Sequence, residues 1–174
     1  PDTGGADAFG PDGNSGSENG GGIAVADAGD VNLNNVIITN NSAADGGGLY
    51  LDASSTAEIT DGWFEGNQAS GSGGAAYTAG NFKLAETEVR ENSAAVHGGG
   101  LFATGLSPDV TTSTFWANQA GSNGGAVALL ETAVGPEFPA RIKETEFWIN
   151  TAGESGGAIW TSDSGAFYLN RILV

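Results

Sequence analysis

A short phrase recurs along the chain: an apolar residue, two variable residues and an asparagine, followed about six residues later by a glycine pair. The clearest copies are Phe-Trp-Ala-Asn at 115–118 with Gly-Gly at 124–125, and Phe-Trp-Ile-Asn at 147–150 with Gly-Gly at 156–157. The asparagines of the five copies stand at positions 41, 67, 92, 118 and 150, so the steps are 26, 25, 26 and 32 residues. Self-similarity at a period of this size indicates a repeat architecture.

Each period contains three short runs that alternate apolar and polar residues as β-strands do, and no stretch has helical spacing. Two columns of inward-facing residues are predicted from positions that recur in every period: Leu33, Ile59, Leu84, Val110 and Ile142, and then Ile38, Phe64, Val89, Phe115 and Phe147. Residues that favour turns separate the runs. The pattern predicts an all-β fold, a right-handed parallel β-helix with about 25–26 residues per rung and about six rungs.

The recurring asparagines are expected to form a ladder inside the helix. The set is Asn41, Asn67, Asn92, Asn118 and Asn150, and each follows an inward apolar residue where the chain turns. A buried asparagine in such a column can bond the backbone and its stacked neighbours, which offsets the loss of hydration.

Aromatic residues occupy predicted outward positions. In the first run these are Tyr50, Tyr77, Phe102 and Trp160, and in the third run they are Trp116 and Trp148. An exposed aromatic column of this length marks a lateral protein contact or a face that stacks on sugars. The alternative is that the stacked rings only stabilise the sheet.

The repeat divides the chain into two parts. Residues 1–19 are rich in Gly, Asp and Ser, and are expected to be a flexible segment or a degenerate first rung. Residues 20–174 are expected to form the β-helix, which stops within a rung. The long step between the last two asparagines places extra residues at 131–139, expected to be either a loop on a binding face or a tolerated surface insertion.

Composition excludes several classes of function. The net charge is −16 with only five Lys and Arg residues, so nucleic acids and anionic lipid surfaces are poor partners. The chain has no cysteine, which excludes disulfides and thiolate metal sites. No apolar run approaches the length of a transmembrane segment. An acidic chain without disulfides suits an extracellular or cell-surface setting in bacteria.

The paired phrases resemble the repeats of chlamydial polymorphic outer membrane proteins, whose hallmark is Phe-x-x-Asn together with Gly-Gly-Ala-(Ile/Leu/Val). Residues 115–118 with 124–127 and residues 147–150 with 156–159 match this hallmark in full, and 64–67 with 73–76 match it in part. The resemblance implies an extracellular or outer-membrane-displayed, adhesin-like β-helix.

Some right-handed β-helices cleave pectin, so catalytic residues have to be considered. Arg-Ile-Lys at 141–143 matches a phrase of polygalacturonases, and His97 before Gly98 resembles another. Glycoside hydrolysis requires a cluster of carboxylates, which is missing from these phrases. We therefore expect no catalytic residues, and we expect His97 to be a solvated loop residue.

No cofactor is expected, although weak calcium binding is an alternative. The candidate ligands are Asp27, Asp30, Asp45 and Asp52, which stand near predicted turns whose carbonyls also suit calcium. The competing interpretation is that all four are solvated turn residues.

The sequence favours a structural or adhesive β-helix on a bacterial surface, which assembles into a homo-oligomer or filament or binds a host or surface ligand. The alternative is a carbohydrate-binding or polysaccharide-degrading β-helix of the pectinase type. The aromatic positions are the expected contact residues in either case.

Overall fold

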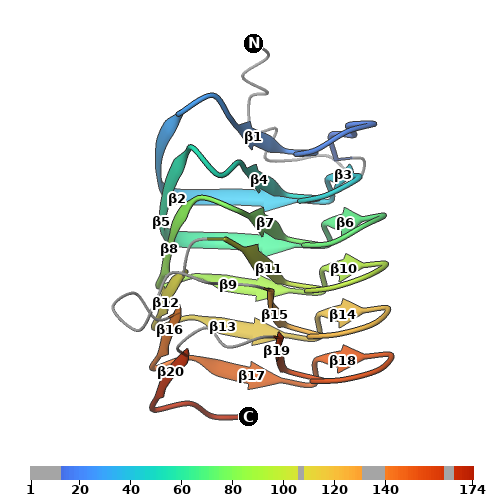
Figure 1. The fold of residues 1–174 in the computed structure, drawn as a ribbon, viewed down its shortest axis with the longest axis vertical. Coiled ribbons are helices and arrows are strands. Elements are labelled where there is room, and N and C mark those ends of the chain that lie inside the picture. The colour runs from blue at the N-terminus through green and yellow to red at the C-terminus, as the bar shows by residue number, and fades with distance from the viewer. Residues whose placement is uncertain (1–12, 106–107, 131–139, 163–166) are drawn as a thin grey trace.

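The computed structural model describes residues 13–105, 108–130, 140–162 and 167–174, and within these ranges the chain forms strands and turns but no helix (Figure 1). Accordingly, this part of the chain contains no helix long and apolar enough to cross a membrane. The expected insertion at 131–139 lies outside the described residues.

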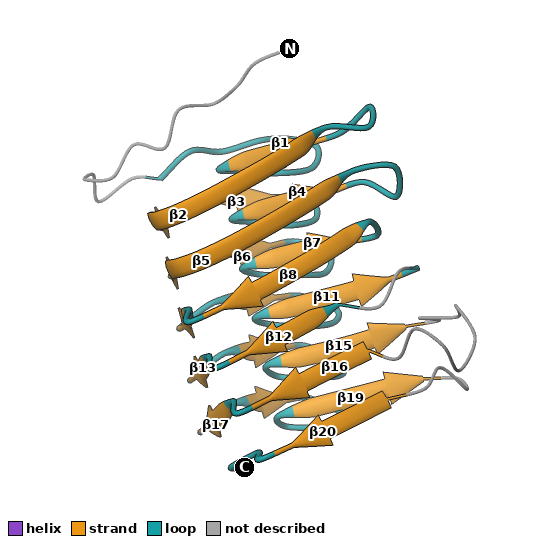
Figure 2. Ribbon diagram, turned by 90° about the vertical axis from the view of Figure 1, so that its left-hand side faces the viewer, coloured by secondary structure: helices purple, strands orange, loops and turns teal. Residues whose placement is uncertain are grey.

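Three parallel sheets run along the rod (Figure 2). The first sheet contains β1 (Ile23–Val25), β4 (Leu49–Leu51), β7 (Ala76–Thr78), β11 (Leu101–Thr104), β15 (Val127–Leu130) and β19 (Ile159–Ser162). The second contains β3 (Ser42–Ala43), β6 (Gln68–Ala69), β10 (Ser93–Ala94), β14 (Gln119–Ala120) and β18 (Thr151–Ala152). The third contains β2 (Asp30–Thr39), β5 (Thr56–Glu65), β8 (Asn81–Ala85), β9 (Glu88–Arg90), β12 (Asp109–Thr111), β13 (Thr114–Trp116), β16 (Ala140–Lys143), β17 (Glu146–Trp148) and β20 (Phe167–Asn170).

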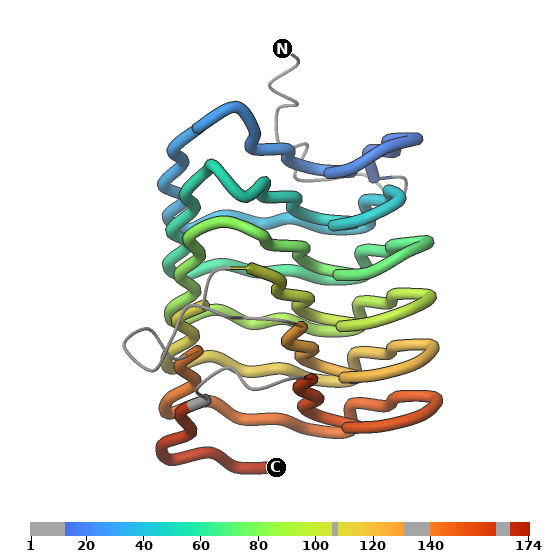
Figure 3. The backbone as a smooth tube through the Cα atoms, in the orientation of Figure 1, coloured from blue at the N-terminus to red at the C-terminus, as the bar shows by residue number. Residues whose placement is uncertain are grey.

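Successive turns of the chain lie directly over one another, as the backbone trace in Figure 3 shows. From β1 to β19 the chain makes about five turns, and every strand pairs in parallel with its counterpart one turn away. The predicted all-β parallel β-helix is therefore confirmed. Residues just before β1 also join the stack, because Asn14 bonds to Asn41 and Ser15 pairs with Ser42.

Both predicted inward columns are confirmed by the strand register. Leu33, Ile59, Leu84, Val110 and Ile142 are consecutive partners, and so are Ile38, Phe64, Val89, Phe115 and Phe147. All of these side chains are buried except Leu33, which is half-buried in the first described turn. The rings of Phe115 and Phe147 stack with centroids 5.2 Å apart, so identical side chains extend the core from rung to rung.

Every rung bends at corners where one residue adopts a left-handed backbone. Glycine supplies the corner before each first-sheet strand, for example Gly73 with φ of 72°. The other two corners use mostly non-glycine residues. One corner column is Asn35, Asp61, Glu86, Thr112 and Glu144, and the other is Asn40, Gly66, Glu91, Ala117 and Ile149. Stacking of successive rungs holds these residues in a conformation that L-amino acids disfavour.

Candidate binding surfaces

The asparagine column forms a continuous hydrogen-bonded ladder through the interior. The Oδ1 of Asn92 accepts two bonds from Asn67, one from its backbone N–H and one from its Nδ2, each 2.9 Å long. The Nδ2 of Asn67 also donates to the backbone oxygen of Ile38 at 2.8 Å. The same pattern links Asn14, Asn41, Asn67, Asn92, Asn118 and Asn150. Each buried amide is thereby satisfied, so the ladder fixes the corner that precedes the second sheet.

A second polar ladder, which sequence reasoning missed, lines the corner within the third sheet. Thr87, Ser113 and Thr145 are buried, and each hydroxyl donates to the backbone oxygen two residues earlier at 2.7–2.8 Å. The hydroxyl of Thr87 also accepts the N–H of Gly62, and that of Ser113 accepts the N–H of Thr87. These bonds connect neighbouring rungs at the corner. Serine and threonine are common in turns, so no sequence signal separates these three residues from solvated ones.

The aromatic residues of the first sheet form a column that includes His97. Tyr50 stacks on Tyr77 at 5.1 Å and Tyr77 on Phe102 at 5.2 Å, while Trp160 lies two strands further on, beyond Ala128. The ring of His97 fills the space left by Ala128, because it stacks on Phe102 at 5.9 Å and on Trp160 at 5.3 Å.

Two expectations are corrected by this column. Phe102 was expected on an exposed face, but its exposed fraction is only 4% because neighbouring rings, including His97, pack on it. His97 was expected to be a solvated loop residue, but it is half-buried between two aromatic rings. Tyr50, Tyr77 and Trp160 are also half-buried, so this column is closed to extensive new contacts. Burial, followed by the proximity of Tyr50 and Asp45, raises the pKa of Tyr77 above its ordinary value.

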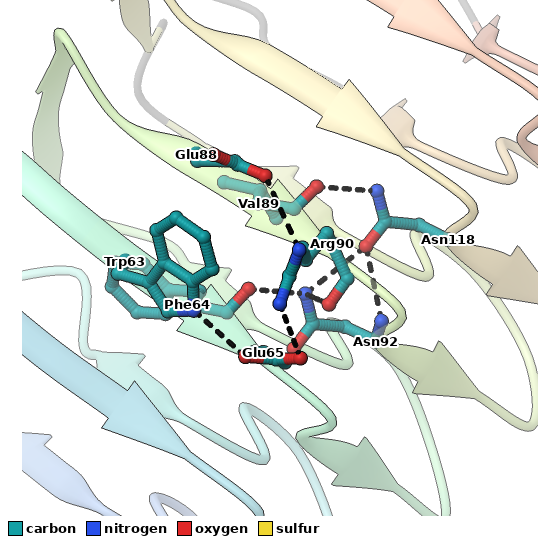
Figure 4. Close-up of polar contacts among 8 residues, drawn as sticks. All are labelled: Trp63, Phe64, Glu65, Glu88, Val89, Arg90, Asn92 and Asn118. Atoms are coloured by element: carbon teal, nitrogen blue, oxygen red, sulfur yellow. Dashed lines mark hydrogen bonds and ion pairs between the residues drawn. The ribbon is translucent and has the colours of Figure 1, made fainter. Parts of the chain in front are cut away.

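The outer side of β5, β9, β13 and β17 carries a second set of aromatic and charged residues. Arg90 forms an ion pair with Glu65 at 2.7 Å, and its guanidinium carbon lies 4.3 Å from the ring centre of Trp63 (Figure 4). The indole N–H of Trp63 donates to the same carboxylate at 2.9 Å, and Glu88 approaches Arg90 at 3.8 Å. The cation of Arg90 is therefore neutralised within the molecule.

Trp116 and Trp148 continue the column from Arg90. Arg90, Trp116 and Trp148 are consecutive Cα partners on β9, β13 and β17. Trp116 is 36% exposed and Trp148 is 43% exposed, while the indole N–H of Trp148 donates to Glu146 at 3.1 Å. We call Trp63, Glu65, Arg90, Trp116 and Trp148 the tryptophan face. It differs from the first-sheet column because its two outermost rings remain accessible to a partner.

Of the four calcium candidates, Asp52 and Asp45 already accept hydrogen bonds. Asp52 accepts bonds from the backbone N–H of Asp27 and from Ser54, while Asp45 accepts the N–H of Ser72 at 2.7 Å. The Ser55 hydroxyl, with these donors, holds the pKa of Asp52 below its ordinary value despite some desolvation. Asp30 begins β2 on the exposed side. In the described ranges, no three or more His, Asp or Glu side chains are grouped to hold a metal ion.

The phrases that resemble polygalacturonases are not brought together as a site. Ile142 is fully buried in the first inward column, and Arg141 projects outward from β16 in the third sheet. His97 contacts aromatic rings of the first sheet instead. Ile142, the middle residue of the phrase at 141–143, is therefore part of the hydrophobic core.

Comparison with known proteins identifies the fold. A family model described as a right handed beta helix region matches residues 3–117, about two thirds of the chain. No curated protein and no solved structure gave a significant match.

Proposed function

Because the chain belongs to the right-handed β-helix family, we propose that it is a structural or adhesive rod of a bacterial extracellular or cell-surface protein, and that copies associate laterally. The paired Phe-x-x-Asn and Gly-Gly-Ala phrases support a surface role through their resemblance to chlamydial polymorphic outer membrane proteins. The proposal is non-catalytic: the chain would act by presenting rigid faces.

The observation that carries the proposal is the exposure of Trp116 and Trp148 side by side on neighbouring strands. Two large indoles on a regular, in-register sheet give a surface that a second copy can match through a two-fold axis. Tryptophan is among the residues that contribute most to protein contacts, since its burial removes a large apolar area from water. Arg90, the cation of this face, is already paired with Glu65 and Glu88, which lowers the cost of burying its charge at an interface.

Charge sets the conditions for this association. Each copy carries a net charge of −16, so two copies repel at low ionic strength. Salt screens that repulsion within about 10 Å at 0.1 M, and calcium can bridge carboxylates of neighbouring copies. Association is therefore expected to strengthen as salt or calcium is added.

Sedimentation velocity over a range of protein concentrations tests the proposal. The wild-type chain should form larger species in 0.5 M salt or with calcium than in dilute buffer, and Trp116→Ser/Trp148→Ser should stay monomeric. Tyr50→Ser, on the closed first-sheet column, serves as the control and should associate as the wild type does. A wild type that is monomeric under every condition would exclude lateral self-association.

A further inference from the structure

We propose that the outer side of the second sheet binds a neutral, hydroxyl-rich carbohydrate chain. This site is distinct from the tryptophan face, which lies on the third sheet, and it does not depend on self-association. The inference comes from a groove that runs along the rod, from the side chains that project into it, and from its lack of charge.

The groove follows the rod axis across β3, β6, β10 and β14 and has a volume of about 700 Å³. Its size is within the range of small-molecule and cofactor sites. Small side chains create the hollow: alanine, serine and glycine predominate among its described lining residues, while the larger side chains are two glutamines. The residues on which the argument depends are Gln68, Ser93, Gln119 and Ala95.

Gln68, Ser93 and Gln119 form one row along the groove. Ser93 is the Cα partner of Gln68 on one side and of Gln119 on the other, so the two glutamines stand two rungs apart, about 10 Å at the usual strand spacing. Neither glutamine amide bonds to another residue in the described ranges. A primary amide and a hydroxyl each both donate and accept hydrogen bonds, as sugar hydroxyls do.

A carbohydrate suits this groove better than a polypeptide strand. The backbone N–H groups of Gln68, Ser93 and Gln119 are already bonded to oxygens of the preceding rung at 2.8–2.9 Å. The groove therefore offers no open strand edge for backbone pairing, which is the usual way to bind an extended peptide. The side chains of Gln68, Ser93 and Gln119 present neutral polar groups along the axis of the rod.

Charge restricts the carbohydrate to a neutral one. None of the described residues that line the groove is charged, although the chain contains 21 acidic residues and has a net charge of −16. An anionic glycan would meet this negative field without a cation in the groove to offset it. A neutral glycan is not repelled, and it loses less hydration on entering an uncharged groove.

Affinity electrophoresis of the wild-type chain in native gels tests the inference. Three neutral polysaccharides, a dextran, a galactomannan and a soluble cellulose derivative without charge, are compared with polygalacturonate as the anionic probe. At least one neutral polysaccharide should slow the wild type, and polygalacturonate should not. Gln68→Ala/Gln119→Ala should weaken the retardation about tenfold or more, because two bonding groups are removed.

A matched pair of variants separates groove binding from surface stickiness. Ala95→Trp fills the groove at an exposed position, and Ala53→Trp adds the same side chain at an exposed turn outside it. Binding should be lost in Ala95→Trp and kept in Ala53→Trp, with both variants melting as the wild type does. Trp116→Ser/Trp148→Ser should also keep polysaccharide binding, even if lateral association is lost. Failure of every neutral polysaccharide to bind, or binding that survives Ala95→Trp, would overturn the inference.

Discussion

The side-chain oxygen of Asn92 accepts both the backbone N–H and the side-chain amide of Asn67, so one atom joins two rungs through two hydrogen bonds. The amide of Asn92 in turn donates to the backbone oxygen of Phe64 at 3.0 Å and to Asn118. Removal of the Asn92 side chain therefore leaves the buried backbone N–H of Asn67 on the preceding rung without its partner, and it takes one of two hydrogen bonds from the Oδ1 of Asn118.

Asn92→Ala is expected to lower the free energy of unfolding by about 1–3 kcal/mol, because the backbone N–H of Asn67 and the backbone oxygen of Phe64 lose their partner. Urea denaturation measures the change. Asn32→Ala, an exposed asparagine on β2, is the control and should change stability little. Equal stability of Asn92→Ala and the wild type would show that the ladder does not stabilise the rod.

Ile149 is expected to be a strained residue whose replacement stabilises the chain. Its φ is 46° and the residue is 67% exposed, so a β-branched residue adopts a left-handed backbone with little packing in return. Ile149→Asn should raise the free energy of unfolding by about 1 kcal/mol, since asparagine tolerates this conformation better. Ile37→Asn, at an exposed strand position, should give no gain. A lower melting temperature for Ile149→Asn would contradict the assignment of strain.

His97 is expected to stabilise the aromatic column through both of its ring contacts. His97→Ala should lower the free energy of unfolding by about 1 kcal/mol or more, because it removes the ring that stacks on both Phe102 and Trp160. His97→Phe should restore most of that stability, and Val96→Ala at the adjacent exposed position serves as the control. The melting temperatures of these variants are measured by thermal unfolding, with circular dichroism as the signal. If His97→Phe were no more stable than His97→Ala, ring stacking would not be the cause.

The inward columns of the core could be predicted from the sequence, whereas the ring contacts of His97 could not. Leu84, Val110 and Phe115 recur at one period with strand alternation, and this pattern is directly visible in the chain. The position of His97 depends on the small side chain of Ala128, which lies between Phe102 and Trp160 in the first sheet, and no local pattern indicates this. For the same reason Phe102 was wrongly placed on an exposed face.

The corners and the groove also escaped prediction. Glycine marks one corner, but Glu86 and Thr112 adopt the same left-handed backbone without any sequence signal, because stacking with neighbouring rungs imposes it. The groove arises from small residues on short two-residue strands, which are too short to show a strand pattern.

Tyr77 provides a test at high pH. Its pKa is raised in the folded chain, so the folded state favours the neutral phenol. The resulting stabilisation is fully present below the unfolded pKa of about 10 and is lost as the pH rises through the folded pKa. Tyr77→Phe should remove this part of the pH dependence of stability. In a titration followed by phenolate absorbance, the tyrosine that ionises at the highest pH in the wild type should be missing from the variant. A titration unchanged by Tyr77→Phe would contradict the assignment.

Lateral contact through the tryptophan face can be tested by a single engineered thiol, since the chain has no cysteine. Thr114→Cys places it on β13 beside Trp116, and Ala53→Cys places it on a turn away from that face. Under mild oxidation in high salt, Thr114→Cys should form a disulfide-linked dimer much faster than Ala53→Cys. Adding Trp116→Ser/Trp148→Ser should abolish the difference. Equal rates for the two thiols, or a fast rate that persists without the tryptophans, would contradict the proposed face-to-face association.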